Sequence, residues 1–162
     1  DPILLFDHIL TGGTSVSMAS RLFQIRERTG LFYTAGGSLL ANAHHEPGMC
    51  FIRAIVSGDR LEEAQSAIEN LFAQKAATIT PEELEQAKNS VIHGIHDHFS
   101  TNKSIATALL FLEKFALPTD FFIRRMERMK SIDTAAVQDV ADRLIDVKNL
   151  NKIIIGRTQK QA

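Results

Sequence analysis

Two polar side chains, Arg26 and Tyr33, stand on either side of a predicted corner of the chain and could contact a ligand together. The run SMASRLFQIRER (17–28) has helical spacing, and Gly30 is a typical helix terminator. The next run, LFYTAGGSLLANA (31–43), is predicted to be extended. Arginine offers paired donors to a carbonyl or carboxylate, and a phenol can donate to a developing oxyanion. The alternative is structural: a cation at a helix C-terminus beside a half-buried strand aromatic, which composition alone favours.

Histidines suggest a metal site in two places. His93 and His96 lie one turn apart in HGIHDH (93–98) and could share a cation, but no carboxylate is well placed beside them. A solvent-exposed polar helix face, which also includes His98, is therefore the favoured interpretation. HHEPG (44–48) has the spacing of neither H-E-x-x-H nor H-x-x-E-H, and its Pro-Gly pair would break the helix that such motifs need. The sequence predicts no metal site in this chain.

Other nucleophile and phosphate motifs are weak. TGGTS (11–15) lacks the lysine of a P-loop and the spacing of a dinucleotide-binding turn, so it is predicted to be a connection. Ser15, Ser17 and Ser20 have no histidine base nearby in the sequence. Cys50 lies within an apolar strand, where a thiol is usually inert.

The bulk composition is that of one ordinary globular domain. The chain has 162 residues, 44% hydrophobic and 23% charged, with a net charge of −1. Such a balance gives no field that would attract nucleic acid or an anionic membrane. No apolar run approaches the ~20 residues of a transmembrane segment. One cysteine allows no intrachain disulfide, so the compartment stays open between bacterial periplasm and cytoplasm.

Three strands are predicted. The segments 31–43 and GMCFIRAIVS (48–57) flank turn-forming residues and predict a β-hairpin. The three isoleucines of NKIIIGR (151–157) predict a short, buried final strand.

Two helices precede the hairpin. PILLFDHIL (2–10) has mostly helical apolar spacing, and the helix before Gly30 has a less regular stripe. The residues expected to face the core are Ile3, Leu4, Phe6, Ile9 and Leu10 in the first helix, and Met18, Leu22, Ile25 and, as a further candidate, Phe23 in the second.

Five helices follow the hairpin, and their starts carry capping signals. Asp59 with Glu62 predicts one capping box, and Thr80 with Glu83 predicts another, with Pro81 at the first helical position. Later helices are predicted at 104–117, ended by Pro118, at 119–132, capped by Thr119 or Asp120, and at 133–145, capped by Asp133. The expected core positions are Leu61, Ala64, Ile68, Leu71 and Phe72, then Leu84, Ala87, Val91 and Ile95, then Val137, Val140, Ala141 and Leu144.

This order of elements predicts an α+β fold with a small, mostly antiparallel sheet packed against several helices. Three strands are few for that many helices. Either a strand is missing at a truncated N-terminal start, or another chain covers an edge of the sheet.

The residues around the corner resemble the insulinase (pitrilysin-like) zinc peptidases and the mitochondrial processing peptidases. Three later stretches, 79–94, 129–145 and 152–157, resemble later elements of the same family, so the likeness runs from about residue 1 to residue 157. The block that carries it consists of Ser20, Arg21, Leu22, Phe23, Ile25, Arg26, Gly30, Leu31 and Tyr33.

In that family two homologous halves face each other across a chamber. One half holds zinc on H-x-x-E-H, and the other has lost the metal and supplies an arginine and a tyrosine toward the bound peptide. The resemblance implies that residues 1–157 form the inactive, C-terminal-type half, lacking its first strand, with residues 158–162 as a tail. It implies that Arg26 and Tyr33 bind substrate.

The resemblance also sets the expected partners. Zinc belongs to a catalytic half, fused upstream or separate, and the substrate is a peptide. A homodimer of this chain is a further expectation. Two other interpretations stay open: a non-proteolytic scaffold subunit of the same fold, and an unrelated α+β binding domain with another strand order.

Overall fold

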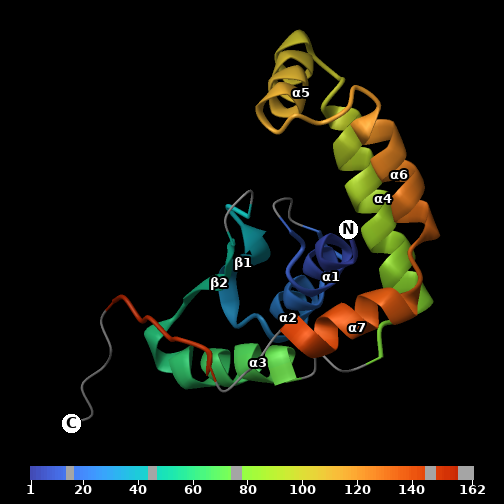
Figure 1. Ribbon diagram of the computed structural model, residues 1–162. Coiled ribbons are helices and arrows are strands. Elements are labelled where there is room, and N and C mark those ends of the chain that lie inside the picture. Colours follow the sequence, from blue (N-terminus) through green and yellow to red (C-terminus); the bar gives the residue numbers. More distant parts are fainter. Residues whose placement is uncertain (14–16, 44–46, 74–77, 145–148, 157–162) are drawn as a thin grey trace.

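The computed structural model describes residues 1–13, 17–43, 47–73, 78–144 and 149–156. Several helices lie to one side of a small hairpin and beneath it, which confirms the predicted α+β class (Figure 1). In chain order the elements are α1 (Pro2–Leu10), α2 (Arg21–Thr29), β1 (Phe32–Ala41), β2 (Met49–Val56), a 3-10 turn (Gly58–Arg60), α3 (Leu61–Ala73), α4 (Pro81–Asp97), α5 (Asn102–Lys114), α6 (Phe121–Ser131) and α7 (Thr134–Leu144).

The predicted hairpin is confirmed: β1 and β2 pair antiparallel and form the whole sheet of the described residues. Ala35 lies opposite Ala54, and Gly37 lies opposite Ile52. Gly37 allows the two backbones to approach closely, because a Cβ there would lie 2.5 Å from the carbonyl oxygen of Phe51. A larger residue at this position would push the two strands apart.

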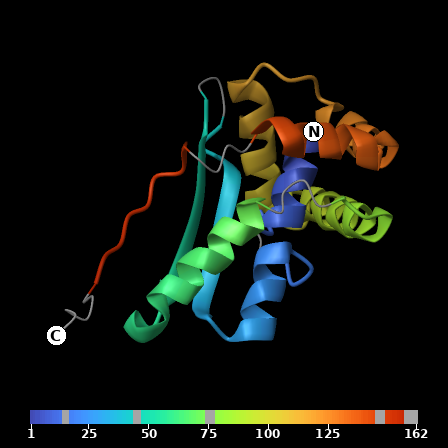
Figure 2. The ribbon, with the colours of Figure 1, turned by 90° about the horizontal axis from the view of Figure 1, so that it is seen from below.

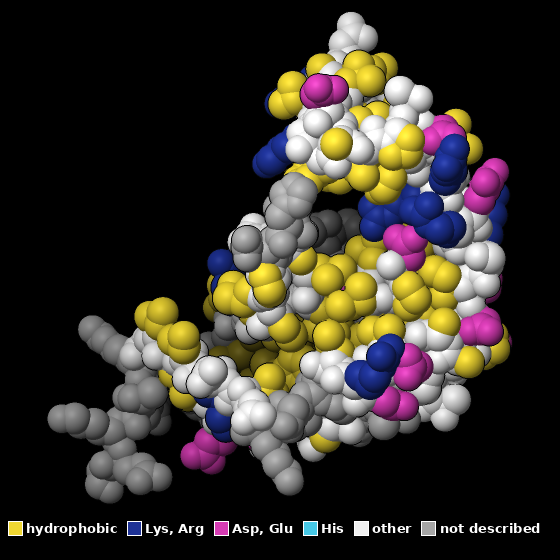
Figure 3. Space-filling model, in the orientation of Figure 1, with side chains coloured by type: hydrophobic (Ala, Val, Ile, Leu, Met, Phe, Trp, Pro, Cys, Tyr) yellow, Lys and Arg dark blue, Asp and Glu magenta, His cyan; other side chains and the backbone are white. Residues whose placement is uncertain are grey.

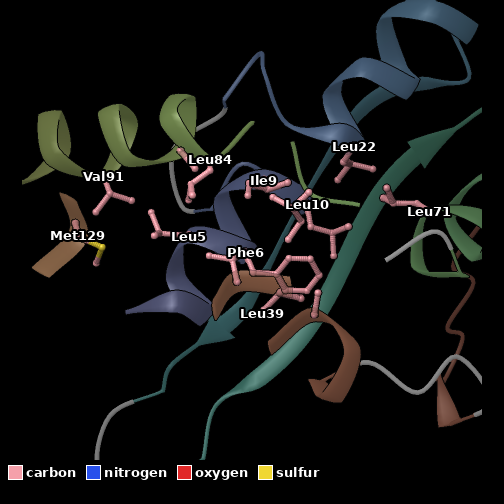
Figure 4. Close-up of a cluster of buried hydrophobic side chains, with 14 of the residues drawn as sticks. Leu5, Phe6, Ile9, Leu10, Leu22, Leu39, Leu71, Leu84, Val91 and Met129 are labelled. Atoms are coloured by element: carbon pink, nitrogen blue, oxygen red, sulfur yellow. The ribbon is translucent and has the colours of Figure 1, made fainter. Parts of the chain in front are cut away.

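Helix α1 is the most deeply buried element. It lies between β1 and α4, and α7 packs on it as well (Figures 1 and 2). Its last six residues, from Leu5 to Leu10, are all buried, as expected for a helix covered on several sides. Its apolar side chains meet those of α4, α6 and the hairpin in one core (Figure 4). The core residues labelled there are Leu5, Phe6, Ile9, Leu10, Leu22, Leu39, Leu71, Leu84, Val91 and Met129.

One polar network ties α1 to the edge of β1. The Asp7 carboxylate, 2% exposed, accepts hydrogen bonds from Thr11 Oγ1 at 2.7 Å, Ser38 Oγ at 2.9 Å and the Leu39 backbone N–H at 2.9 Å. Thr11 Oγ1 also lies 3.1 Å from the Gly37 carbonyl oxygen. A buried carboxylate is tolerated only when donors surround it, and here they come from both elements.

The capping box at the start of α4 is confirmed. Glu83 N–H donates to Thr80 Oγ1 at 3.2 Å, and Thr80 N–H donates to the Glu83 carboxylate at 3.0 Å. The predicted apolar stripe of α4 is buried as well. At α7, Asp133 caps as predicted, since its carboxylate accepts from Ala136 N–H at 2.9 Å. Asp120 is the N-cap residue of α6 by position, but its side chain makes no capping hydrogen bond and pairs with Arg124 instead.

Helix α5 stands at the far end of α4 and α6, away from the sheet (Figure 1). Phe111 of α5 stacks against Phe121 and Phe122 of α6, which fixes this end of the molecule. The other side of α5 exposes Leu109 and Leu110. Figure 3 shows the surface hollowed between α5 and the hairpin, with hydrophobic side chains gathered below α5.

Three local expectations are wrong. Met18 is 72% exposed, because α2 begins only at Arg21 and Met18 lies in the turn before it. Asp59 does not cap α3: it lies within the 3-10 turn, and its carboxylate accepts a hydrogen bond from Ser57. Leu144 ends α7 on its exposed side, at 40% exposure, where the helix leaves the core.

The predicted final strand is also wrong. Residues 149–156 form no strand, and Ile153 and Ile155 are 85% and 94% exposed. The segment lies outside β2, on the side away from β1 (Figure 2). Lys152 binds Glu69 of α3 at 2.6 Å, which holds this segment on the helix. Isoleucine favours a strand only where the backbone pairs with a neighbouring strand, and residues 149–156 form no such pairing with a described strand.

Some expectations lie outside the described residues. These are Ser15, the histidines and glutamate of the 44–48 turn, Ile145, and the end of the chain with the predicted tail 158–162.

Candidate functional site

The predicted corner exists, and its geometry follows from its sequence. Ser20 caps α2, since its hydroxyl accepts from Phe23 N–H at 3.3 Å. Gly30 adopts the left-handed conformation (φ 59°), and its N–H donates to the Arg26 carbonyl at 2.9 Å. Leu31 and Phe32 are then buried. The helix therefore stops at a defined angle, with both sides of the corner anchored.

Arg26 lies in the last turn of α2 and leans over the start of β1. Its Nε donates to the backbone carbonyl of Tyr33 at 3.4 Å. Its Nη1 lies 2.7 Å from the Glu27 carboxylate, and its guanidinium carbon lies 5.5 Å from the centre of the Phe23 ring. The side chain is 36% exposed. The guanidinium is thus held at the corner and still accessible.

Tyr33 is 82% exposed, the second residue of β1. Its backbone bonds to Arg26, while its ring is not packed into the core. The expectation of a half-buried strand aromatic does not describe this residue. The structure therefore places Arg26 against the backbone of Tyr33 at one accessible corner, and the contact of both side chains with a ligand stays a prediction.

A second arginine of α2 has a structural partner that sequence reasoning missed. Arg21 binds Glu83 with two hydrogen bonds, from Nε at 2.7 Å and from Nη2 at 2.9 Å. This bond from Arg21, against partial burial, holds the pKa of the Glu83 carboxyl below its usual value. Glu83 therefore caps α4 and clamps α2 to α4 at once. The two residues are 62 positions apart, so no local pattern could reveal the pair.

An open groove of about 440 Å³ lies beside α2 but does not include the corner. It is lined by Gln24, Ile25 and Arg28, together with residues of α3 and α4. At the edge of the groove, the Arg21 guanidinium is paired with the Glu83 carboxylate. Neither Arg26 nor Tyr33 lines it. The corner is the candidate site because it carries an accessible guanidinium and an exposed phenol.

Metal chemistry finds no support in the described parts of the chain. They contain no group of three or more His, Cys, Asp or Glu side chains that could hold a metal ion. His93 and His96 are exposed on α4, and the ring of His98 stacks against Phe122 with centroids 5.3 Å apart. Cys50 lies on β2, where desolvation raises the pKa of its thiol and disfavours the reactive thiolate.

None of the described helices has the length and apolar character needed to cross a bilayer.

Comparison with protein families gives a match over more than half of the chain. Residues 1–91 match the family model described as the peptidase M16 inactive domain. This range contains α1, α2, the hairpin and the corner. No curated protein sequence matches the chain.

Solved structures share this fold at low sequence identity. A peptidase M16 inactive domain from Pseudomonas fluorescens superposes with a TM-score of 0.74 at 20% identity, covering 90% of this chain and 34% of that one. A conserved protein from Enterococcus faecalis gives 0.71 at 18%, covering 88% and 32%. A protein from Bordetella pertussis, provisionally described as a zinc protease, gives 0.66 at 18%, covering 86% and 74%. The chain thus spans about a third of the length of the first two.

Proposed function

Since this chain belongs to the peptidase M16 inactive-domain family, we propose that it is the substrate-contacting, zinc-free half of a zinc endopeptidase. Family membership bears out the resemblance to the non-catalytic domain of the insulinase-type peptidases and removes the alternative of an unrelated binding domain. In this proposal residues 1–157 act as one unit beside a catalytic half that carries zinc on H-x-x-E-H. That half, the peptide substrate and any homodimer of this chain belong to the proposal.

The observation that carries the proposal is the accessible pair at the corner. Arg26 and Tyr33 lie next to each other at the end of α2, and neither side chain is buried in the core. Tyr33 is 82% exposed. A ring kept only for stability would be expected to bury its apolar surface.

Each group has a chemical role in peptide hydrolysis. In the catalytic half, zinc held on H-x-x-E-H would activate a water molecule for attack on the scissile carbonyl. Arg26 donates to a peptide oxygen and fixes the position of the substrate. The Tyr33 hydroxyl donates to the oxygen on which negative charge develops, which stabilises the transition state more than the ground state.

The test uses Arg26→Ala and Tyr33→Phe, with Arg28→Ala as the matched control from the same helix turn. In the complete two-half enzyme, Tyr33→Phe should lower kcat/KM by about 100- to 1000-fold, the usual effect of losing one oxyanion donor. Arg26→Ala should lower it as well, and Arg28→Ala should leave it near the parent value. All three variants of this chain alone should unfold within ~0.5 kcal/mol of the parent, as expected for exposed sites.

The rival proposal is a scaffold subunit of the same fold, which cuts no peptide. It predicts that the assembled parent complex cleaves no peptide and that Arg26 and Tyr33 matter only for stability. If the parent complex is an active peptidase, variants that are destabilised but keep full activity would retire the substrate-contacting role.

A further inference from the structure

The guanidinium of Arg26 is contacted on three sides, and these contacts decide which donors remain. Nε is engaged by the Tyr33 carbonyl at 3.4 Å, and Nη1 is engaged by the Glu27 carboxylate at 2.7 Å. The Phe23 ring lies 5.5 Å from the guanidinium carbon. Among the described residues, none is hydrogen-bonded to Nη2.

Arginine binds a carboxylate through two neighbouring nitrogens, either Nε with Nη2 or Nη1 with Nη2. At this corner the single N–H of Nε is taken by the Tyr33 carbonyl, so the Nε–Nη2 pair is engaged. Nη1 carries two N–H groups and Glu27 takes one of them, so the Nη1–Nη2 pair still offers donors. A ligand that binds there comes close to the Glu27 carboxylate.

The charge of Arg26 is compensated as well. Glu27 holds a negative charge 2.7 Å from Nη1, so an approaching anion meets both the cation and its partner. A neutral carbonyl oxygen meets no such repulsion. The geometry and the charge thus favour the same kind of ligand.

We propose that Glu27 is a specificity-determining residue: its carboxylate lies beside the remaining donors of Arg26, so that the corner selects an uncharged peptide carbonyl over a carboxylate. This inference rests on the proposed function, because it assumes that the corner contacts a peptide. It assigns the interior of a peptide chain, and not its carboxyl terminus or acidic side chains, to this contact.

The test compares two probes that differ only in charge: N-acetyl-tetra-alanine amide and N-acetyl-tetra-alanine with a free carboxylate. Binding to the chain is followed by NMR titration at constant ionic strength, reading the backbone amide signals of residues 29–34 in every variant and the Arg26 Nε–H signal wherever the arginine is present. The parent should prefer the amide probe. Glu27→Gln should tighten binding of the carboxylate probe by about two- to fivefold, the scale of one exposed charge pair, and leave the amide probe unchanged.

The matched control is Asp139→Asn, which removes one exposed carboxylate from the Arg143–Asp139 pair on α7. It changes the net charge equally and should leave the ratio of the two affinities unchanged. An equal change with both Glu27→Gln and Asp139→Asn would mean that overall charge, not the corner, sets the preference.

The two proposals fail in different ways. If Arg26→Ala does not weaken either probe, or if neither probe shifts the Arg26 signal of the parent, the corner does not bind peptide and the proposed function falls with the inference. If Arg26→Ala weakens the amide probe but Glu27→Gln leaves the ratio of affinities unchanged, only the role of Glu27 is overturned.

Discussion

The two outer edges of the hairpin differ in whether their backbone groups have hydrogen-bond partners among the described residues. The outer edge of β1, which we call the closed edge, is met by side chains: Asp7 and Thr11 of the α1 region bind Leu39 and Gly37, and Arg26 binds Tyr33. The outer edge of β2, which we call the open edge, is paired with no strand of the described residues.

The difference shows what can close a strand edge. At the closed edge, side-chain oxygens and a guanidinium satisfy individual backbone groups, and the helices that supply them cover the strand. At the open edge, the nearby apolar residues 153–155 offer no bond to the strand, and both they and Ile55 remain exposed. Polar side chains on fixed helices close an edge, whereas apolar composition alone does not.

The largest expected effect is at the buried carboxylate of the closed edge. Asp7→Ala leaves the Ser38 hydroxyl and the Leu39 N–H without their acceptor, and should cost about 2–4 kcal/mol of unfolding free energy. Asp7→Asn, which keeps one acceptor oxygen, should cost less. The measurement is a urea melt, with Asp139→Ala on α7 as the exposed control. A loss below ~0.5 kcal/mol for Asp7→Ala would show that the network does not hold this edge.

The next effect concerns the support behind the closed edge. Helix α4 packs on α1, so loosening its first turn should weaken α1 as well. Thr80→Ala removes the cap and should cost about 1 kcal/mol, whereas Thr80→Ser should be nearly neutral. The measurement is the denaturant midpoint of each variant. Equal midpoints would show that the Thr80 hydroxyl does not stabilise the start of α4.

Lowering the pH should weaken the closed edge, because His8 neighbours the Asp7 carboxylate that binds this edge. Burial lowers the pKa of His8, which neighbours Asp7, and the Asp7 charge opposes this only in part. His8 therefore contributes stability above its unfolded pKa of ~6.5, and this is lost as pH falls below that value toward the lower folded pKa. Amide exchange at Leu39 should accelerate between pH 7.5 and 5.5, relative to the intrinsic rate.

The control for this effect is a pair of histidine variants. His8→Gln should flatten the pH dependence of the unfolding free energy over the same range. His93→Gln, which removes an exposed histidine of α4, should leave that dependence as it is in the parent. A parent protein with constant stability over the range would mean that His8 does not titrate with unfolding.

The smallest effect is expected on the exposed face of the open edge. Ile55→Thr should change the unfolding free energy by less than ~0.5 kcal/mol, because its side chain is already half in solvent. Ile52→Thr is the matched comparison on the opposite face of β2, where the residue packs against the core, and it should cost more. Equal losses would show that the open edge contributes to stability after all.

The same contrast explains what the sequence could predict. The corner follows from signals within a few residues: the Ser20 cap, the Gly30 terminator and the apolar pair that begins β1. The α4 cap is local in the same sense. Family likeness then pointed to Arg26 and Tyr33, whose accessibility only the structure provides.

Features that depend on distant partners were not predictable. Asp7 stands in an apolar helix, and its acceptor role needs Ser38 and Leu39, more than 30 positions later. Arg21 finds Glu83 from another helix. The isoleucines at 153–155 led to a wrong prediction of a final strand for the same reason. Their β-propensity has an effect only beside a neighbouring strand, and a single sequence does not show which strand that would be.

The position of α1 in the chain has a consequence for synthesis. Its apolar side chains are covered by α4 and α7, and α7 is nearly the last element to be made. At ~5–20 residues per second, α7 follows α1 by roughly 6–25 s. During that interval the most apolar helix of the domain has left the ribosome without its final cover. Transiently exposed apolar surface makes an incomplete chain prone to aggregation, so α1 is the helix that most needs its late cover.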